Sequence, residues 1–255
     1  MNATLAPAWG LAVRSLRNIG RLPSAFVPAL MMPLVQVVAF SGTFAGITVV
    51  QGFPTDRSVN WYLPLAVTMG SSFAGLGTGF AMIRDLQSGF YDRLRMSPAG
   101  RRSLLLGPFI AAWARAMISV TLVVIVGIAL GARPTSWVAF PSLVVVGLGT
   151  ATIGTGWGLG LAYRFGDMRA AAIMQLTLFL GLFLTDAQTP IDVMRGWLVP
   201  VATINPLSRV LGLARQGFLD DGASWSTTLW GLVTLSAIGT ATAAFAMGGL
   251  RRLER

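Results

Sequence analysis

The chain has 255 residues, of which 54% are hydrophobic and 11% are charged, and its mean hydropathy is +0.69. A soluble globular domain carries roughly 25% charged residues, so this chain has too few charged side chains to cover a water-facing surface. The composition therefore excludes an ordinary soluble domain and indicates an integral membrane protein. The net charge of +10 comes from arginine, because all 19 basic residues are arginines.

Six long apolar stretches follow one another along the chain. A helix that crosses the hydrocarbon core needs roughly 20 apolar residues. Stretches of this kind lie at 26–50, 61–83, 106–130, 138–162, 171–187 and 228–249. A β-barrel would need alternating segments of about ten residues, and runs such as 119–130 do not alternate. The sequence therefore predicts an all-α integral membrane protein with six transmembrane helices.

The distribution of arginines predicts the orientation. With the N-terminus inside, fourteen arginines, Arg115 among them, fall in inside segments and five fall in outside segments. Basic residues near span ends favour the cytoplasmic side, so both termini are expected in the cytoplasm. A nucleic-acid partner is not expected, because the arginines are spread over short loops. No secretory signal peptide is visible, and residues 1–23 are interpreted as an interfacial segment with an amphipathic helix at 5–20.

Several kinds of chemistry are excluded by missing residue types. The chain has no histidine and no cysteine, which removes serine–histidine and cysteine–histidine catalysis and the usual zinc sites. Without lysine it has no phosphate-binding loop of the GxxxxGK[ST] type. Among nine acidic residues only Asp186 lies near a predicted span, whereas proton-driven transporters keep a relay within the membrane. We therefore expect no catalytic, cofactor or metal site, and an energy source in a partner.

The longest predicted cytoplasmic loop, 84–102, contains a short amphipathic helix at 88–98. Its apolar members are Phe90, Tyr91 and Leu94, and its charged members are Asp92, Arg93 and Arg95. Ser97 and Pro98 are typical of the end of one helix and the start of the next. Two interpretations are open. The helix is either held at the surface by interfacial lipid or is the docking site of a partner.

A second unusual segment is the predicted outer loop 188–227. Thr189–Pro190 and Asn205–Pro206 each have the pattern of an N-cap followed by proline, which predicts short apolar helices at 190–202 and 206–219. These helices either dip into the outer leaflet as a re-entrant hairpin or rest on the outer surface. In the first case the non-helical backbone has to be buried in protein or line a wet cavity.

Two glycine-rich runs, 75–80 and 154–160, resemble phosphate loops only superficially. They lie inside apolar spans with no basic residue beside them, so close packing of helices through small residues is the expected role. Gln36, Gln175 and Thr177 are polar residues within spans. They either line a pathway or make hydrogen bonds between helices.

Taken together, these features resemble the ABC-2 type permease family, the membrane subunits of type-2 bacterial ABC exporters. The resemblance covers nearly the whole chain as one domain, 1–255, and is greatest to daunorubicin-resistance-like permeases. The resemblance depends mainly on two segments, RD…SGFYDRLRMSPAGRRSLLLG at 84–107 and NPLSRVLGLARQGFL at 205–219. Many relatives have Glu where this chain has Asp85, Gln87 and the Phe90–Tyr91 pair, so the contact with an ATPase is expected to differ in detail.

The resemblance implies a non-catalytic permease subunit of an ATP-driven exporter in the bacterial plasma membrane. ATP and Mg²⁺ would be bound by a dimer of separate ATPase subunits, with a second permease copy or a homologous permease completing the complex. The coupling residues would be Phe90, Tyr91, Asp92, Arg93, Leu94 and Arg95. The outer gate would be formed by Pro190, Trp197, Asn205 and Pro206. The expected substrate is a hydrophobic drug or lipid.

Three alternatives remain from the residues: export of a polysaccharide or glycolipid, a secondary transporter or channel, and an intramembrane enzyme. The second lacks embedded acidic residues, and the third lacks histidine, cysteine and an embedded carboxylate pair.

Overall fold

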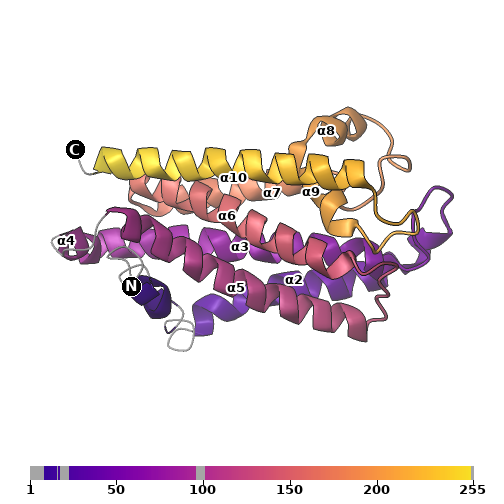
Figure 1. Cartoon of the computed structure of the whole chain (residues 1–255), viewed down its shortest axis with the longest axis horizontal. Coiled ribbons are helices and arrows are strands. Elements are labelled where there is room, and N and C mark those ends of the chain that lie inside the picture. Colours follow the sequence, from indigo (N-terminus) through magenta and orange to yellow (C-terminus); the bar gives the residue numbers. More distant parts are fainter. Residues whose placement is uncertain (1–8, 16, 18–22, 96–100, 254–255) are drawn as a thin grey trace.

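The computed structural model describes residues 9–15, 17, 23–95 and 101–253, which form an elongated helical bundle (Figure 1). No strand occurs in these described ranges. The long helices lie roughly along the long axis of the bundle. We call the end that carries α4 (Phe90–Arg95) the α4 end, and the opposite end, which carries α8 (Leu198–Ile204), the α8 end. Residues 9–15 and the last turns of α10 lie at the α4 end.

Six long helices form the bundle, and each coincides with one predicted span. They are α2 (Pro23–Thr43), α3 (Ser58–Gln87), α5 (Arg101–Ala129), α6 (Ala139–Phe165), α7 (Met168–Phe183) and α10 (Trp225–Leu253). Shorter elements are the 3₁₀ turn η1 (Ala45–Val49) and α9 (Pro206–Arg215), in addition to α4 and α8. The first predicted span, 26–50, was too long, because the α-helix ends at Thr43 and η1 follows.

Four of the long helices meet the length and apolarity needed to cross a membrane. These are 58–87, 105–129, 139–165 and 225–253. The apolar parts of α2 and α7, Leu30–Thr43 and Met168–Phe183, are shorter than that. The all-α fold is therefore confirmed, with four helices in the described residues that are long and apolar enough to span a membrane, while the count of six spans stays a prediction.

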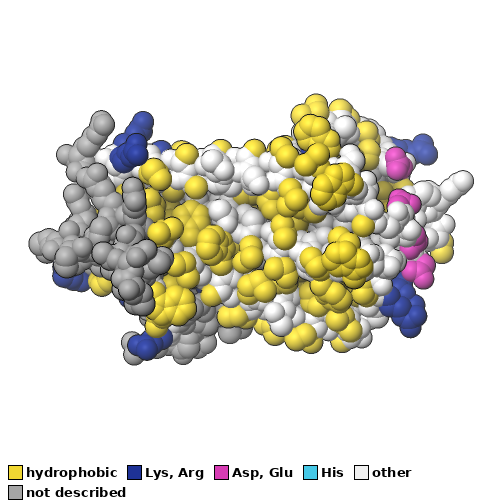
Figure 2. Space-filling view, viewed as in Figure 1, with side chains coloured by type: hydrophobic (Ala, Val, Ile, Leu, Met, Phe, Trp, Pro, Cys, Tyr) yellow, Lys and Arg dark blue, Asp and Glu magenta, His cyan; other side chains and the backbone are white. Residues whose placement is uncertain are grey.

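The surface of the bundle is divided into an apolar middle and charged ends. Figure 2 shows hydrophobic side chains over the central part, with arginines at both ends and acidic residues at the α8 end. Three tryptophans at the α8 end, Trp137, Trp197 and Trp225, are 81%, 71% and 78% exposed. Tryptophans favour the boundary between membrane and water, so they mark one edge of the apolar zone.

Helix α3 is the central element, since α2, α4, α5, α6, α7 and α9 all pack against it. Its closest neighbour is α6, and the two backbones meet through glycines. A Cβ atom at Gly75 would overlap the carbonyl oxygen of Ala151, and one at Gly79 would lie 2.7 Å from the Cα of Gly158. The glycine-rich runs therefore allow close helix packing, as the sequence indicated.

Polar side chains within the spans also make contacts between helices. The indole N–H of Trp157 in α6 donates to the hydroxyl of Thr177 in α7 at 2.7 Å. The indole N–H of Trp113 in α5 donates to Thr152 in α6 at 2.9 Å. For Thr177 the hydrogen-bonding interpretation is thus confirmed.

One predicted placement was wrong. Arg115 was assigned to the cytoplasmic segments, but it is the central residue of the 29-residue α5 and is only 9% exposed. Arg115 lies fourteen residues from each end of α5, about four helical turns, so it cannot belong to the loop that precedes this helix. Without Arg115, the predicted inside segments still hold thirteen arginines against five.

The glycine contact between α3 and α6 gives the first prediction. We expect Gly75→Ala to lower the free energy of unfolding by about 1–3 kcal/mol, because the new methyl group meets backbone that cannot move aside cheaply. Gly42→Ala in α2 is the matched control, because nothing lies within 4 Å of its Cβ position and alanine is the better helix former. Thermal unfolding in one detergent measures both. Equal stability of the two variants would contradict the close contact.

Candidate functional site

The α4 end begins with a sharp break after α3. The amide of Ser88 donates to the carbonyl of Arg84 at 2.9 Å and that of Gly89 to Leu86 at 3.2 Å, which closes the last turn of α3. Gly89 has φ of 65°, a left-handed conformation that glycine adopts without strain. The chain therefore leaves the axis of α3 at Gly89 and starts α4 at Phe90, within the segment 88–98 where a short helix was predicted.

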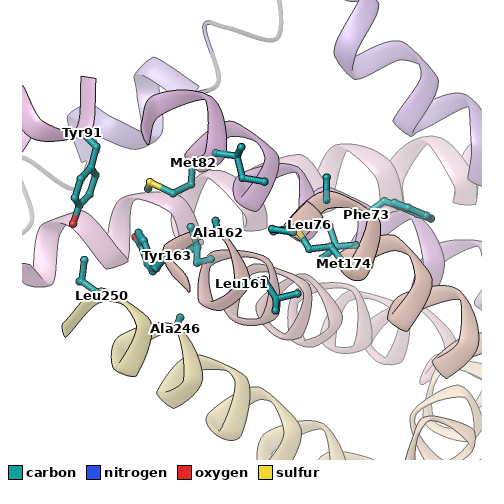
Figure 3. Packing of buried hydrophobic residues seen from close by; sticks show 14 of the residues in the cluster. Phe73, Leu76, Met82, Tyr91, Leu161, Ala162, Tyr163, Met174, Ala246 and Leu250 are labelled. Atoms are coloured by element: carbon teal, nitrogen blue, oxygen red, sulfur yellow. The ribbon is translucent and has the colours of Figure 1, made fainter. Parts of the chain in front are cut away.

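Tyr91 anchors α4 to the bundle. Its side chain is 1% exposed, and its ring centroid lies 6.2 Å from that of Tyr163 at the end of α6. Figure 3 shows Tyr91 extending from α4 toward Tyr163 and Leu250, so that α4 meets the ends of both α6 and α10. The Tyr91 side chain, which was predicted to take part in the contact with the ATPase, therefore lies against its own bundle. A six-residue helix is too short to be stable alone, and Tyr91 provides packing of α4 on its own chain.

The segment before α2 covers the other side of this junction. Arg14 forms an ion pair with Asp85 at 2.8 Å, and its guanidinium lies 3.8 Å from the centroid of the Phe90 ring. Leu11 and the fully buried Ala12 pack against the bundle, while Trp9 is 59% exposed. The helical residues 9–15 thus belong to the α4 end, as the amphipathic pattern predicted, and Phe90 is covered by Arg14.

The remaining coupling residues are placed only in part. Arg93 lies in α4 with an exposed side chain. Asp92, Leu94 and Arg95 also belong to α4, but their side chains lie outside the described part, as do Ser97 and Pro98. The structure therefore brings Phe90, Tyr91 and Arg93 to one end of the bundle, and their role in coupling stays a prediction.

At the α8 end a buried arginine joins three segments. Arg215 of α9 is 1% exposed and forms an ion pair with Asp186 at 2.6 Å. Its Nη2 donates to the carbonyls of Asp186 and Ala187, both at 3.1 Å, and the guanidinium lies 3.4 Å from the Trp61 ring of α3. Trp61 in turn donates to the Ala187 carbonyl at 3.2 Å. No local sequence pattern indicated this site, because Asp186 and Arg215 lie 29 residues apart.

Asn205 connects α7 to α9. Its side-chain oxygen accepts from the amide of Leu207 at 2.9 Å, and its side-chain nitrogen donates to the carbonyls of Gly181 and Leu184, both at 2.9 Å. Pro206 is the first residue of α9. The predicted N-cap is confirmed, and the same side chain also satisfies two carbonyls at the end of α7 that would otherwise lack partners.

The first of the two helices predicted for the outer loop does not form as expected. A helix was expected at 190–202, but Pro190 starts only one turn, closed by the amide of Met194, and α8 begins at Leu198. Gly196, with φ of 82°, interrupts the segment between them. The second helix ends at Arg215 rather than 219. Of the four residues assigned to the outer gate, Pro190 is buried, Asn205 is half-buried, and Trp197 and Pro206 are exposed.

The Arg215 site gives the second prediction. We expect Arg215→Ala to reduce the free energy of unfolding by about 3–5 kcal/mol, because Asp186 and two buried carbonyls lose their donor. Arg209→Ala is the control on the same helix, since Arg209 is exposed and its only described ring contact is 5.2 Å from Trp230. Its loss should cost about 1 kcal/mol or less. Equal melting temperatures for the two variants would rule out a stabilising role for the buried pair.

Comparison with known proteins agrees with this architecture. The family model described as ABC-2 type transporter matches residues 8–219. A putative transport permease, ycf38, from Porphyra purpurea is 26% identical over 241 residues, which cover 89% of this chain and 80% of the relative. The daunorubicin resistance ABC transporter permease protein DrrB1 from Streptomyces coeruleorubidus is 23% identical over 231 residues, covering 87% of this chain and 79% of the relative. Since the family match extends over most of the sequence and includes both ends of the bundle, the chain belongs to the ABC-2 type transporter family.

Proposed function

We propose that this chain is the membrane-spanning permease subunit of an ATP-driven exporter, coupled to a separate ATPase subunit, that moves a hydrophobic drug-like or lipid substrate out of the cell. The observation that carries the proposal is the family match over residues 8–219. The relatives named as transport permeases and as a daunorubicin resistance permease support transport and favour an apolar cargo.

The α4 end is the proposed contact with the ATPase. It carries a short helix that projects beyond α3 (Figure 1), and the exposed Arg93 lies on that helix. Tyr91 packs against the ends of α6 and α10, so a push on α4 reaches two long helices directly. In this proposal Tyr91 transmits a displacement of α4 to the ends of α6 and α10. The outer surface of α4 supplies the contact with the ATPase.

The mechanism is alternating access. A dimer of ATPase subunits binds ATP and Mg²⁺, closes, and displaces α4 on each of two permeases, either two copies of this chain or this chain and a homologue. The long helices then rotate, and an apolar pathway between the permeases opens to the outside. The α8 end, with Pro190, Trp197, Asn205 and Pro206, forms the outer gate.

Coupling gives the third prediction. We expect Arg93→Glu to weaken association with the ATPase and to reduce substrate-stimulated ATP hydrolysis, since it reverses an exposed charge on the docking helix. The permease is co-purified with its partner ATPase and assayed in proteoliposomes. The chain by itself should show no ATP hydrolysis, because it has no lysine for a phosphate loop.

Arg251→Glu is the matched control, since Arg251 is an exposed arginine at the α4 end of α10. It should leave association near that of the wild type. If Arg93→Glu binds and couples normally, the ATPase docks elsewhere, and the turn around Asp167 and Arg169, at the same end of α6 and α7, is the next candidate.

Orientation gives the fourth prediction. The proposed plasma-membrane topology has the α4 end and both termini in the cytoplasm, in agreement with the excess of arginines there. Single cysteines at positions 2 and 253 can be introduced into this cysteine-free chain. An impermeant maleimide should label neither in intact cells, whereas a cysteine at the exposed Asp221 should react. Labelling of position 253 from outside would invert the topology.

A further inference from the structure

Arg115 is a charged residue for which the described side chains provide no counter-ion. It is the central residue of α5 and is 9% exposed. Its Nε donates to the Ala111 carbonyl in the preceding turn at 3.3 Å, while its Nη2 is buried without a hydrogen-bond partner. An unpaired buried charge is costly, and ionisable residues inside spans usually face a pathway or a ligand.

The acidic residues of the described chain cannot neutralise Arg115. Asp85, the acidic residue of α3, is already paired with Arg14, and Asp186 is paired with Arg215. The other described acidic residues lie in loops, at a helix cap or in α4, at the ends of the bundle. A second copy of this chain would bring acidic residues to the same end positions, so the missing negative charge has to come from another molecule.

The surface of α3 opposite Arg115 is built of small residues. Ala74, Gly77 and Ala81 are spaced by three and four positions and so share one face of the helix, and all three remain partly exposed. A Cβ at Gly77 would lie 3.7 Å from Nη1 of Arg115, which places the guanidinium beside this stripe. Nη1 of Arg115 therefore lies beside this small-residue stripe, and Nη2 of the same guanidinium has no hydrogen-bond partner.

The approach that we propose for a ligand lies between α2 and α5. Helix α2 packs mainly against α3 and much less against α5. The hydrogen bond from Nε to Ala111 directs the guanidinium toward the α4 end of α5. In the proposed topology that is the half of the membrane facing the cytoplasm, where an exporter takes up its cargo.

We propose that Arg115, together with the stripe formed by Ala74, Gly77 and Ala81, binds the oxyanion of the transported amphiphile, a phosphate or carboxylate at its head. This inference rests on the proposed export function and adds the chemistry of the substrate. The end of a guanidinium offers two parallel N–H donors, which match two oxygens of such a group. Chain-like apolar parts of the same molecule would lie along α3 and α5.

The test uses the complete exporter in phosphatidylcholine vesicles with two probes that differ in head-group charge. The probes are fluorescent phosphatidylglycerol, with a net negative phosphate, and fluorescent phosphatidylcholine, whose phosphate is balanced by choline. ATP-driven movement between leaflets is followed by quenching. We expect the wild type to move the phosphatidylglycerol probe faster, and Arg115→Gln to reduce that preference roughly tenfold, the loss of one charge-assisted contact. Arg115→Lys should retain part of it.

Arg133→Gln is the control, because it removes the charge of an exposed arginine at the α8 end; it should keep the wild-type preference. Unchanged selectivity in Arg115→Gln, or equal loss for both probes with a lowered melting temperature, would overturn the inference. Binding of the phosphatidylglycerol probe through Arg115 without movement would identify a resident lipid and overturn the substrate assignment. Complete absence of ATP-driven movement together with unstimulated ATP hydrolysis would instead count against the export function itself.

Discussion

The close contact between α3 and α6 sets the geometry of the whole bundle. Because glycines remove the side chains at the contact, the two backbones approach within van der Waals distance of each other. The same principle extends outward, since Gly156 and Gly160 of α6 face Thr242 and Phe245 of α10. Three helices thus form a rigid slab, and α2, α5 and α7 are packed around it with fewer constraints.

The two ends of this slab are fastened by different interactions. At the α8 end, Arg215 uses charge, hydrogen bonds and ring stacking in one fully buried group, which gives a joint with little freedom. At the α4 end, the Tyr91 packing and the half-exposed Arg14–Asp85 pair hold α4 by apolar contact and by a pair that water screens. An end that receives a push from a partner benefits from the second kind of joint, since it can move without leaving a buried charge unpaired.

Hydropathy predicted the six long helices because a long apolar run is a local property, and the Asn205–Pro206 cap was found because capping depends on adjacent residues. The features that the sequence did not predict depend on residues that are close in space but distant in the sequence. The helix expected at 190–202 is broken at Gly196, whose positive φ of 82° ends the turn that starts at Pro190. The burial of Tyr91 against Tyr163 could not be predicted, because amphipathic spacing defines a face of a helix without indicating what covers it. Arg215 and Asp186 are 29 residues apart, so no local pattern joins them.

Helix α7 has 16 residues, a length of about 24 Å, whereas the hydrocarbon core is about 30 Å thick. The carbonyls of Gly181 and Leu184 at its end accept from the side-chain nitrogen of Asn205, so in the predicted six-span topology α7 could stop below the membrane surface without leaving these two groups unpaired. A bilayer against this helix would have to thin, at a cost of a fraction of a kcal/mol per Å of hydrophobic mismatch. A neighbouring helix of the same length would avoid that cost, which makes the environment of α7 sensitive to acyl-chain length.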